Sequence, residues 1–127
     1  MSETKAEFID AVTQLAESLY DFHERFGIEG TEGAGRDVIL EVFTSRLPFL
    51  IEEIGEHASA INRADDVNAT EEMADILYIV LGTLVRLGRR GNYAMTQVAE
   101  KNNQKTTSTH RIEPLSGKLI RLGNLPS

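Results

Sequence analysis

Residues 69–88 constrain the fold more than any other stretch. If they form a helix, apolar side chains lie on nearly every side of it instead of in one stripe. The apolar residues are Met73, Ala74, Ile76, Leu77, Ile79, Val80, Leu81, Leu84, Val85 and Leu87. A helix of this kind is buried on several sides. In a domain this small, we expect a second copy of the chain to cover part of it. The segment therefore predicts a central helix that packs on several neighbours.

Two helices are predicted before this segment. In residues 4–26, apolar side chains recur at three- and four-residue spacing and form a single stripe. Residues 36–63 carry a second helical pattern, but Pro48 interrupts it, and a proline in a helix interior removes a hydrogen bond. We therefore expect a short helix that ends near Ser45 and another that begins near Arg46, with the proline in its first turn.

The remaining segments are predicted to be connections and a tail. Residues 27–35 hold four glycines without the ending of a phosphate-binding loop, so we expect a flexible connector rather than a lid. Asn68 is expected to cap the central helix. A weaker helix is predicted from Tyr93 to about Lys105. Residues 106–127 are expected to form an extended tail with a small hairpin at Ser116-Gly117.

Two acidic pairs have a spacing of three within predicted helices, Glu53 with Glu56 and Glu72 with Asp75. Residues three apart project from the same helix face. If the two helices pack antiparallel, the four carboxylates converge, and they repel one another unless a cation lies between them. Hard divalent cations such as Mg²⁺ take oxygen ligands and share them with substrate phosphates. The spacing indicates a metal site, although acids that stabilise a helix start or a solvated face give the same pattern.

The surroundings of the two pairs favour the metal site. The second pair lies at the start of the apolar segment 69–88, where unpaired charge is costly. The first pair and Ala60 lie opposite the stripe that Leu47, Ile54 and Ile61 form on their helix. A purely structural helix would turn that side to water, whereas a small alanine allows another helix to approach closely.

Composition limits the classes of partner. With no cysteine and three scattered histidines, we expect no structural zinc site. The polar N-terminus and the short apolar run 76–85 favour a cytoplasmic protein without a membrane span. The net charge of −7 argues against broad nucleic-acid binding. Because 18 of the 20 acidic residues lie in residues 1–75, the basic half that follows could hold phosphates or serve subunit association.

The acidic pairs lie within "IEEIGEHASAI" and "EEMADILYIVLG", and the chain continues through "VAEKNNQKT" and "GKLIR". These segments resemble the MazG-like branch of the all-α nucleotide pyrophosphohydrolases, and the last two are similar to the tail of phosphoribosyl-ATP pyrophosphohydrolase-like members. The resemblance covers roughly residues 40–122. It implies a single all-α domain, a four- to five-helix bundle with its core at about residues 36–105, assembled as a homodimer or a dimer of dimers.

The resemblance also implies a reaction and a set of site residues. The reaction is Mg²⁺-dependent cleavage of a nucleoside triphosphate between the α and β phosphates, with Mn²⁺ as a substitute metal. The implied metal ligands are Glu53, Glu56, Glu72 and Asp75. Glu52 would orient or deprotonate the attacking water, and Glu53 would serve in catalysis as well as ligation. Asn102 and Lys105 would contact phosphate or sugar, and Lys101 is added on the ground of its charge.

The sequence leaves the substrate open, because no residue marks a pocket for the base. A dUTP-directed or house-cleaning enzyme, in the manner of dUTPase-like members, is the first hypothesis. A phosphoribosyl-ATP pyrophosphohydrolase would use the same chemistry on another substrate. The alternative from a different class is a catalytically silent helical dimer, in which the acids only cap and solubilise helices.

Overall fold

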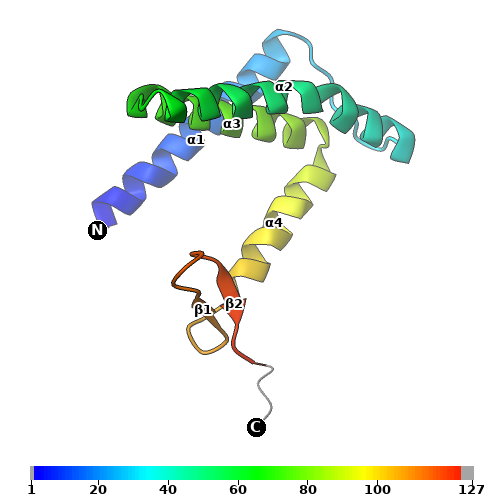
Figure 1. Cartoon of the computed structure of the whole chain (residues 1–127). Coiled ribbons are helices and arrows are strands. Elements are labelled where there is room, and N and C mark those ends of the chain that lie inside the picture. The colour runs from blue at the N-terminus through cyan, green and yellow to red at the C-terminus, as the bar shows by residue number, and fades with distance from the viewer. Residues whose placement is uncertain (1, 124–127) are drawn as a thin grey trace. The chain divides into compact units, whose positions relative to one another are not determined.

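The computed structural model describes residues 2–123, which contain four helices and one two-stranded hairpin. The elements are α1 (Ser2–Arg25), α2 (Arg36–Asn62), α3 (Asp66–Arg86), α4 (Arg89–Asn103), β1 (His110–Ile112) and β2 (Leu119–Arg121) (Figure 1). The predicted all-α class is confirmed. The chain divides between Asn92 and Tyr93 into two compact units, and each is described by itself.

The first unit is built on α2 and α3, which run side by side as an antiparallel pair (Figure 1). The turn between them places Ala64 at a φ of 55°. Asp65, not Asn68, caps α3, because its carboxylate accepts a hydrogen bond of 3.1 Å from the backbone N–H of Asn68. The predicted cap is therefore wrong. An acid three residues earlier supplies the side-chain oxygen, and the helix begins at Asp66.

The predicted break at Pro48 is also wrong, because α2 is a single helix with the proline in its interior. An interior proline costs about 3 kcal/mol. The contacts of α2 with α3 offset this cost. Arg46, two residues before the proline, donates hydrogen bonds to Thr83 Oγ1 at 2.7 Å and to the backbone oxygen of Ile79 at 3.1 Å. These bonds hold α2 against α3 at the place where its own hydrogen bonding is interrupted.

The core of the first unit is small, and the buried apolar residues in the described part are Leu19, Ile39, Val42, Ala60 and Leu87. Ala60 is fully buried, so the close helix approach that its size permits is present. The opposite stripe of Leu47, Ile54 and Ile61 is 52%, 48% and 57% exposed. In α2 the apolar stripe therefore faces outward in one copy of the chain.

Helix α1 packs on α3, where the ring of Phe22 meets the edge of Tyr78 at 6.2 Å between ring centroids. The connector to α2 is tied to the end of α3, since Thr31 donates from its N–H and its hydroxyl to the backbone oxygen of Arg86, each at 2.7 Å. No helix of the described residues is long and apolar enough to cross a membrane.

The second unit contains most of α4 and the hairpin. Strands β1 and β2 pair antiparallel, with His110 opposite Arg121, so the predicted hairpin is confirmed. Gly117 in the turn has a φ of 72°, a conformation that favours glycine. Residues 124–127 of the predicted tail lie outside the described part.

Candidate metal centre

Three of the predicted ligands come together between α2 and α3. Glu53 and Glu56 project from α2 and Glu72 from α3, and each offers one carboxylate oxygen to a group whose atoms all lie within 4.8 Å of one another. We call these three residues the carboxylate cluster. The spacing of three on α2 and the antiparallel pairing with α3 produce this convergence.

Asp75 and Glu52 lie beside the cluster without belonging to it. Asp75 is close enough for its charge to raise the pKa of Glu53, and Glu52 acts in the same way on Glu56. Glu52 is exposed. The structure thus groups three of the four predicted ligands and places the fourth, one helical turn beyond Glu72, within electrostatic reach.

Two oxygens of the cluster are buried and lack a hydrogen-bond partner among the described residues, Oε2 of Glu53 and Oε2 of Glu72. Two ionised carboxylates cannot donate to each other, so each oxygen is left with desolvation and no compensating bond. Buried acceptors of this kind need either a proton or a cation.

The pKa values of Glu53 and Glu56 reflect the same repulsion between the carboxylates of the cluster. The largest cause that raises the pKa of Glu53 to about 7 is the hydrogen bond that its protonated form can donate to Glu72, followed by burial and the charges of Glu56, Glu72 and Asp75. The charge of Glu72 is the largest cause that raises the pKa of Glu56. Without a cation, the cluster therefore retains a proton close to neutral pH.

These residues fit a hard divalent cation. They supply only carboxylate oxygens, the donor type that Mg²⁺ and Mn²⁺ prefer. Their oxygens converge, and two of them have no other partner. An acidic row that merely solvates a helix would point its oxygens into water. The cluster differs from such a row because one oxygen of Glu53 and one of Glu72 are buried.

A hollow of about 530 Å³ opens beside the cluster. Its lining residues are Glu52, Gly55, Glu56, Ser59, Arg63, Asn68 and Glu72. Sequence reasoning missed Arg63 and Asn68 as parts of this site. Their spacing could have revealed them, because Arg63 lies two helical turns after Glu56 and Asn68 one turn before Glu72. The hollow offers room for a substrate next to the carboxylates.

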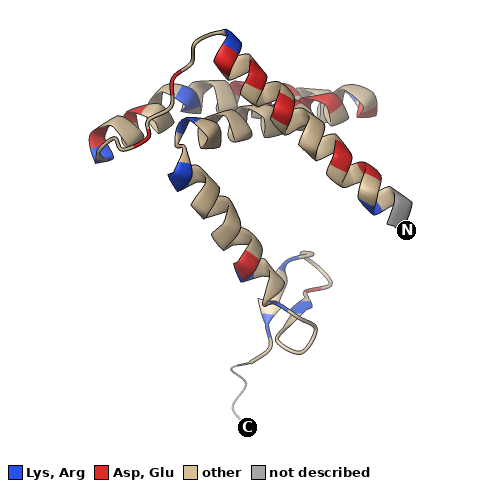
Figure 2. Ribbon diagram, turned by 180° about the vertical axis from the view of Figure 1, so that it is seen from behind, with Lys and Arg blue, Asp and Glu red and all other residues tan. Residues whose placement is uncertain are grey.

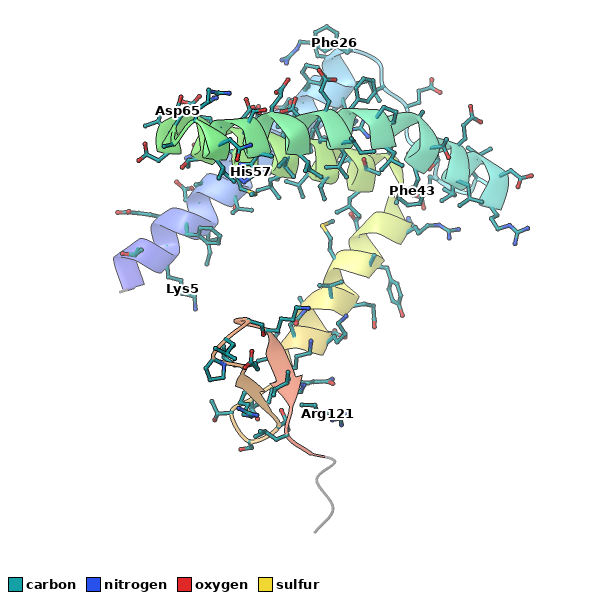
Figure 3. All side chains as sticks on the ribbon, in the orientation of Figure 1. Lys5, Phe26, Phe43, His57, Asp65 and Arg121 are labelled. Atoms are coloured by element: carbon teal, nitrogen blue, oxygen red, sulfur yellow. The ribbon has the colours of Figure 1, made fainter. Side chains whose placement is uncertain are left out.

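His57 helps to position the cluster, although it is not part of it. Its Nδ1 lies 2.9 Å from the backbone oxygen of Ala69 and joins α2 to α3 one residue after Glu56 (Figure 3). This bond fixes the two helices beside the carboxylates.

The predicted substrate-binding residues Lys101, Asn102 and Lys105 belong to the second unit. Lys105 donates to Oδ1 of Asn102 at 3.2 Å, and the amide of Asn102 donates to the backbone oxygen of Val98. Lys101 is exposed beside a separate hollow on α4. Acidic residues prevail in the first three helices and basic residues from α4 onward (Figure 2).

Gly55 gives a test of packing beside the cluster. A Cβ at this position meets no atom within 4 Å, so we expect Gly55→Ala to raise the free energy of unfolding by about 1 kcal/mol through helix propensity. The matched control is Gly82→Ala in α3, whose Cβ would lie 2.7 Å from Nη2 of Arg46 and should destabilise the protein by roughly 1–3 kcal/mol. Urea denaturation measures both. A destabilised Gly55→Ala would contradict the open space at residue 55.

Comparison with known proteins adds one match. The family model described as MazG nucleotide pyrophosphohydrolase domain matches residues 41–112, more than half of the chain. These residues include the whole carboxylate cluster, α3 and α4. No curated protein and no solved structure matches significantly.

Proposed function

Because the chain belongs to the MazG nucleotide pyrophosphohydrolase family, we propose that it hydrolyses nucleoside triphosphates between the α and β phosphates, releasing a monophosphate and pyrophosphate. As a member of this family it is a hydrolase that acts on acid anhydrides of nucleotides. The observation that carries the proposal is the carboxylate cluster, whose oxygens lie within 4.8 Å of one another with two of them buried and unpartnered.

In this proposal Glu53, Glu56 and Glu72 hold Mg²⁺, with Mn²⁺ as a substitute, and Asp75 completes the ligand set. A bound divalent cation of this type neutralises phosphate charge and polarises the phosphoryl oxygens. The cluster supports this assignment because a cation replaces the proton that Glu53 otherwise retains near pH 7.

Glu52 is the proposed base. Its exposed carboxylate lines the hollow next to Glu56, so it can accept a hydrogen bond, and then a proton, from a water that enters there. General-base assistance of this kind contributes about 10²–10⁴-fold to a rate. Arg63, the residue that caps the end of α2, lines the same hollow and supplies a positive charge for the phosphates.

We propose that the second unit holds further substrate-binding residues. Lys101 and Lys105 add positive charge to that of Arg63, and Asn102 offers an amide for phosphate or sugar. We propose that residues 1–127 act as one MazG-like domain, with its core at about 36–105 and a tail from residue 106. The proposed substrate class is dUTP or another nucleotide removed in house-cleaning, with phosphoribosyl-ATP as the alternative.

A panel of nucleoside triphosphates and phosphoribosyl-ATP tests this subclass. Pyrophosphate release is measured for each with Mg²⁺ and with EDTA. A clear preference for dUTP or a modified nucleotide supports the house-cleaning proposal, and a preference for phosphoribosyl-ATP supports the alternative. If folded protein with Mg²⁺ releases pyrophosphate from none of these substrates, the catalytically silent helical dimer is the better account.

We further propose that the enzyme is a homodimer or a dimer of dimers. The support is the outward stripe of Leu47, Ile54 and Ile61, three apolar side chains of one helix that are each about half exposed in one copy of the chain. Association that covers this stripe removes the apolar surface from water.

The stripe yields a prediction for assembly. Leu47→Asp combined with Ile61→Asp should lower the molar mass measured by light scattering, because two buried carboxylates would oppose association. Val67→Asp, at an exposed apolar residue of α3 outside the stripe, is the control and should leave the mass unchanged. An unchanged mass in the double variant would contradict the role of the stripe.

A further inference from the structure

Three basic side chains meet at Gly82, away from the carboxylate cluster. A Cβ on Gly82 would lie 2.7 Å from Nη2 of Arg46 on α2 and 3.3 Å from Nε2 of His23 on α1. Arg86 follows Gly82 by one helical turn on the same face of α3. We call His23, Arg46 and Arg86 the basic junction, since each of the three helices supplies one member.

The junction has polar atoms without partners. His23 is only 5% exposed, and its Nδ1 has no hydrogen-bond partner. The Nε of Arg86 is likewise buried and unpartnered. Arg46 uses Nε and Nη2 for Thr83 and Ile79. Among residues 2–123, the salt bridge of the structure joins Arg89 to Glu32. Neither Arg46 nor Arg86 therefore forms an ion pair with a carboxylate in this part of the chain.

This arrangement is costly without an anion. Arginine stays protonated at any physiological pH, and the partly buried Arg46 and the buried Nε of Arg86 need a counter-charge or hydrogen bonds. Burial is the main cause that lowers the pKa of His23, followed by the charges of Arg46 and Arg86. Burial and Arg86 lower the pKa of Arg46 as well. Both charged groups that act on His23 are therefore positive.

We propose that the basic junction binds a phosphate group. The guanidinium fork matches tetrahedral oxyanions, and the unpartnered nitrogens of His23 and Arg86 supply further donors. Arg46 and Thr83 also line a cavity of about 370 Å³ that is otherwise mostly apolar, and His23 and Arg86 lie outside its lining. Arg46 lies two helical turns before Glu53, about 10 Å along α2, so the junction is a second site and not an extension of the cluster.

The phosphate can come from a bound nucleotide or from free orthophosphate, and the proposal holds for either source. Free phosphate would act on the resting protein. A nucleotide phosphate would bind at the junction while the cluster holds the cleaved part of the substrate, which deepens the proposed function. The test separates these sources and uses no turnover, so its outcome is independent of catalysis.

The experiment follows the histidine ring signals by NMR in metal-free protein at constant ionic strength. Orthophosphate should shift the His23 signals in a saturable manner and raise the pKa of His23, while His57 and His110 serve as internal controls. Arg86→Gln should weaken this response about tenfold or more, and Arg86→Lys should restore part of it. The wild-type titration alone tests the proposal if the glutamine variant does not fold.

A second arm uses a non-hydrolysable triphosphate analogue with Mg²⁺. If the analogue shifts the His23 signals in a saturable manner and this shift is lost in Glu53→Gln, the nucleotide is the source of the phosphate. If only orthophosphate shifts the His23 signals in a saturable manner, free phosphate is the source. If neither ligand shifts His23 saturably, or if all three histidines shift together in proportion to concentration, the basic junction is not a phosphate site.

Discussion

Glu53→Gln is expected to lower kcat/KM for the best triphosphate on the order of 10³-fold, or about 4 kcal/mol of transition-state stabilisation. Glu53 is the member of the carboxylate cluster with a buried, unpartnered oxygen and a pKa raised to about 7. Glutamine keeps the size of the side chain but replaces one anionic oxygen with an amide that repels a cation. Steady-state kinetics at several Mg²⁺ concentrations measure the effect.

Glu71→Gln is the matched control for this prediction. Glu71 precedes Glu72 in α3, is exposed, and is not among the charges that raise the pKa values of Glu53 and Glu56. The control should therefore retain wild-type activity. Equal losses in both variants would mean that activity follows the overall acidity of the surface, and an active Glu53→Gln would remove the cluster from catalysis.

Stability of the metal-free protein should fall as the pH rises from about 4.5 to 7. The folded-state pKa of Glu53 is raised to about 7 from its ordinary value of 4.5, so in this range the folded protein holds a proton that the unfolded chain releases. The free energy of unfolding is then highest at the acidic end, and this contribution is lost as the pH rises through 7. Glu56, whose pKa is also raised, acts with the same sign.

Mg²⁺ should reverse the loss at pH 7.5, since a ligand at 100 times its Kd stabilises the native state by about 2.7 kcal/mol. Melting temperatures of the wild type and Glu53→Gln, with Mg²⁺ and with EDTA, measure both effects. The lowered pKa values of His23 and Glu113 change stability with pH in both proteins, so their contribution cancels in the comparison. If the melting temperatures of the wild type and of Glu53→Gln respond identically to pH and to Mg²⁺, the raised pKa of Glu53 and its role in metal binding are contradicted.

Much of this site was predictable because it depends on local periodicity. The spacing of three in Glu53 and Glu56 and in Glu72 and Asp75 fixes the helix face of each pair. The position of Ala60 on the face of the first pair indicated where a second helix packs, and this residue is fully buried. Asp75 stands outside the group of three because side-chain direction, and not only spacing, decides which oxygens meet.

The errors arose where tertiary contacts outweigh local preference. Pro48 predicted a break, but Arg46 joins α2 to α3 across that position. Asn68 was a reasonable cap by residue type, and Asp65 displaced it by three residues. The start of α4 depends on Glu32, whose carboxylate accepts from the N–H of Arg89, 57 residues later in the chain. No local pattern contains such a contact.

The basic junction lay outside sequence reasoning altogether. His23 was one of three scattered histidines, and Arg46 and Arg86 are 40 residues apart in the chain. Gly82 alone carried a signal, since a glycine within an otherwise apolar helix often marks close approach by another group. The packing of α1 on α3 brings these residues together, and it could not be read from their spacing.

The most direct test of the account is ³¹P NMR of the products that wild-type protein forms from the best triphosphate in the presence of Mg²⁺. The account predicts nucleoside monophosphate and pyrophosphate in equal amounts, no product with EDTA, and none above background with Glu53→Gln. Diphosphate with orthophosphate would contradict cleavage between the α and β phosphates. Full turnover in EDTA would contradict the metal centre itself.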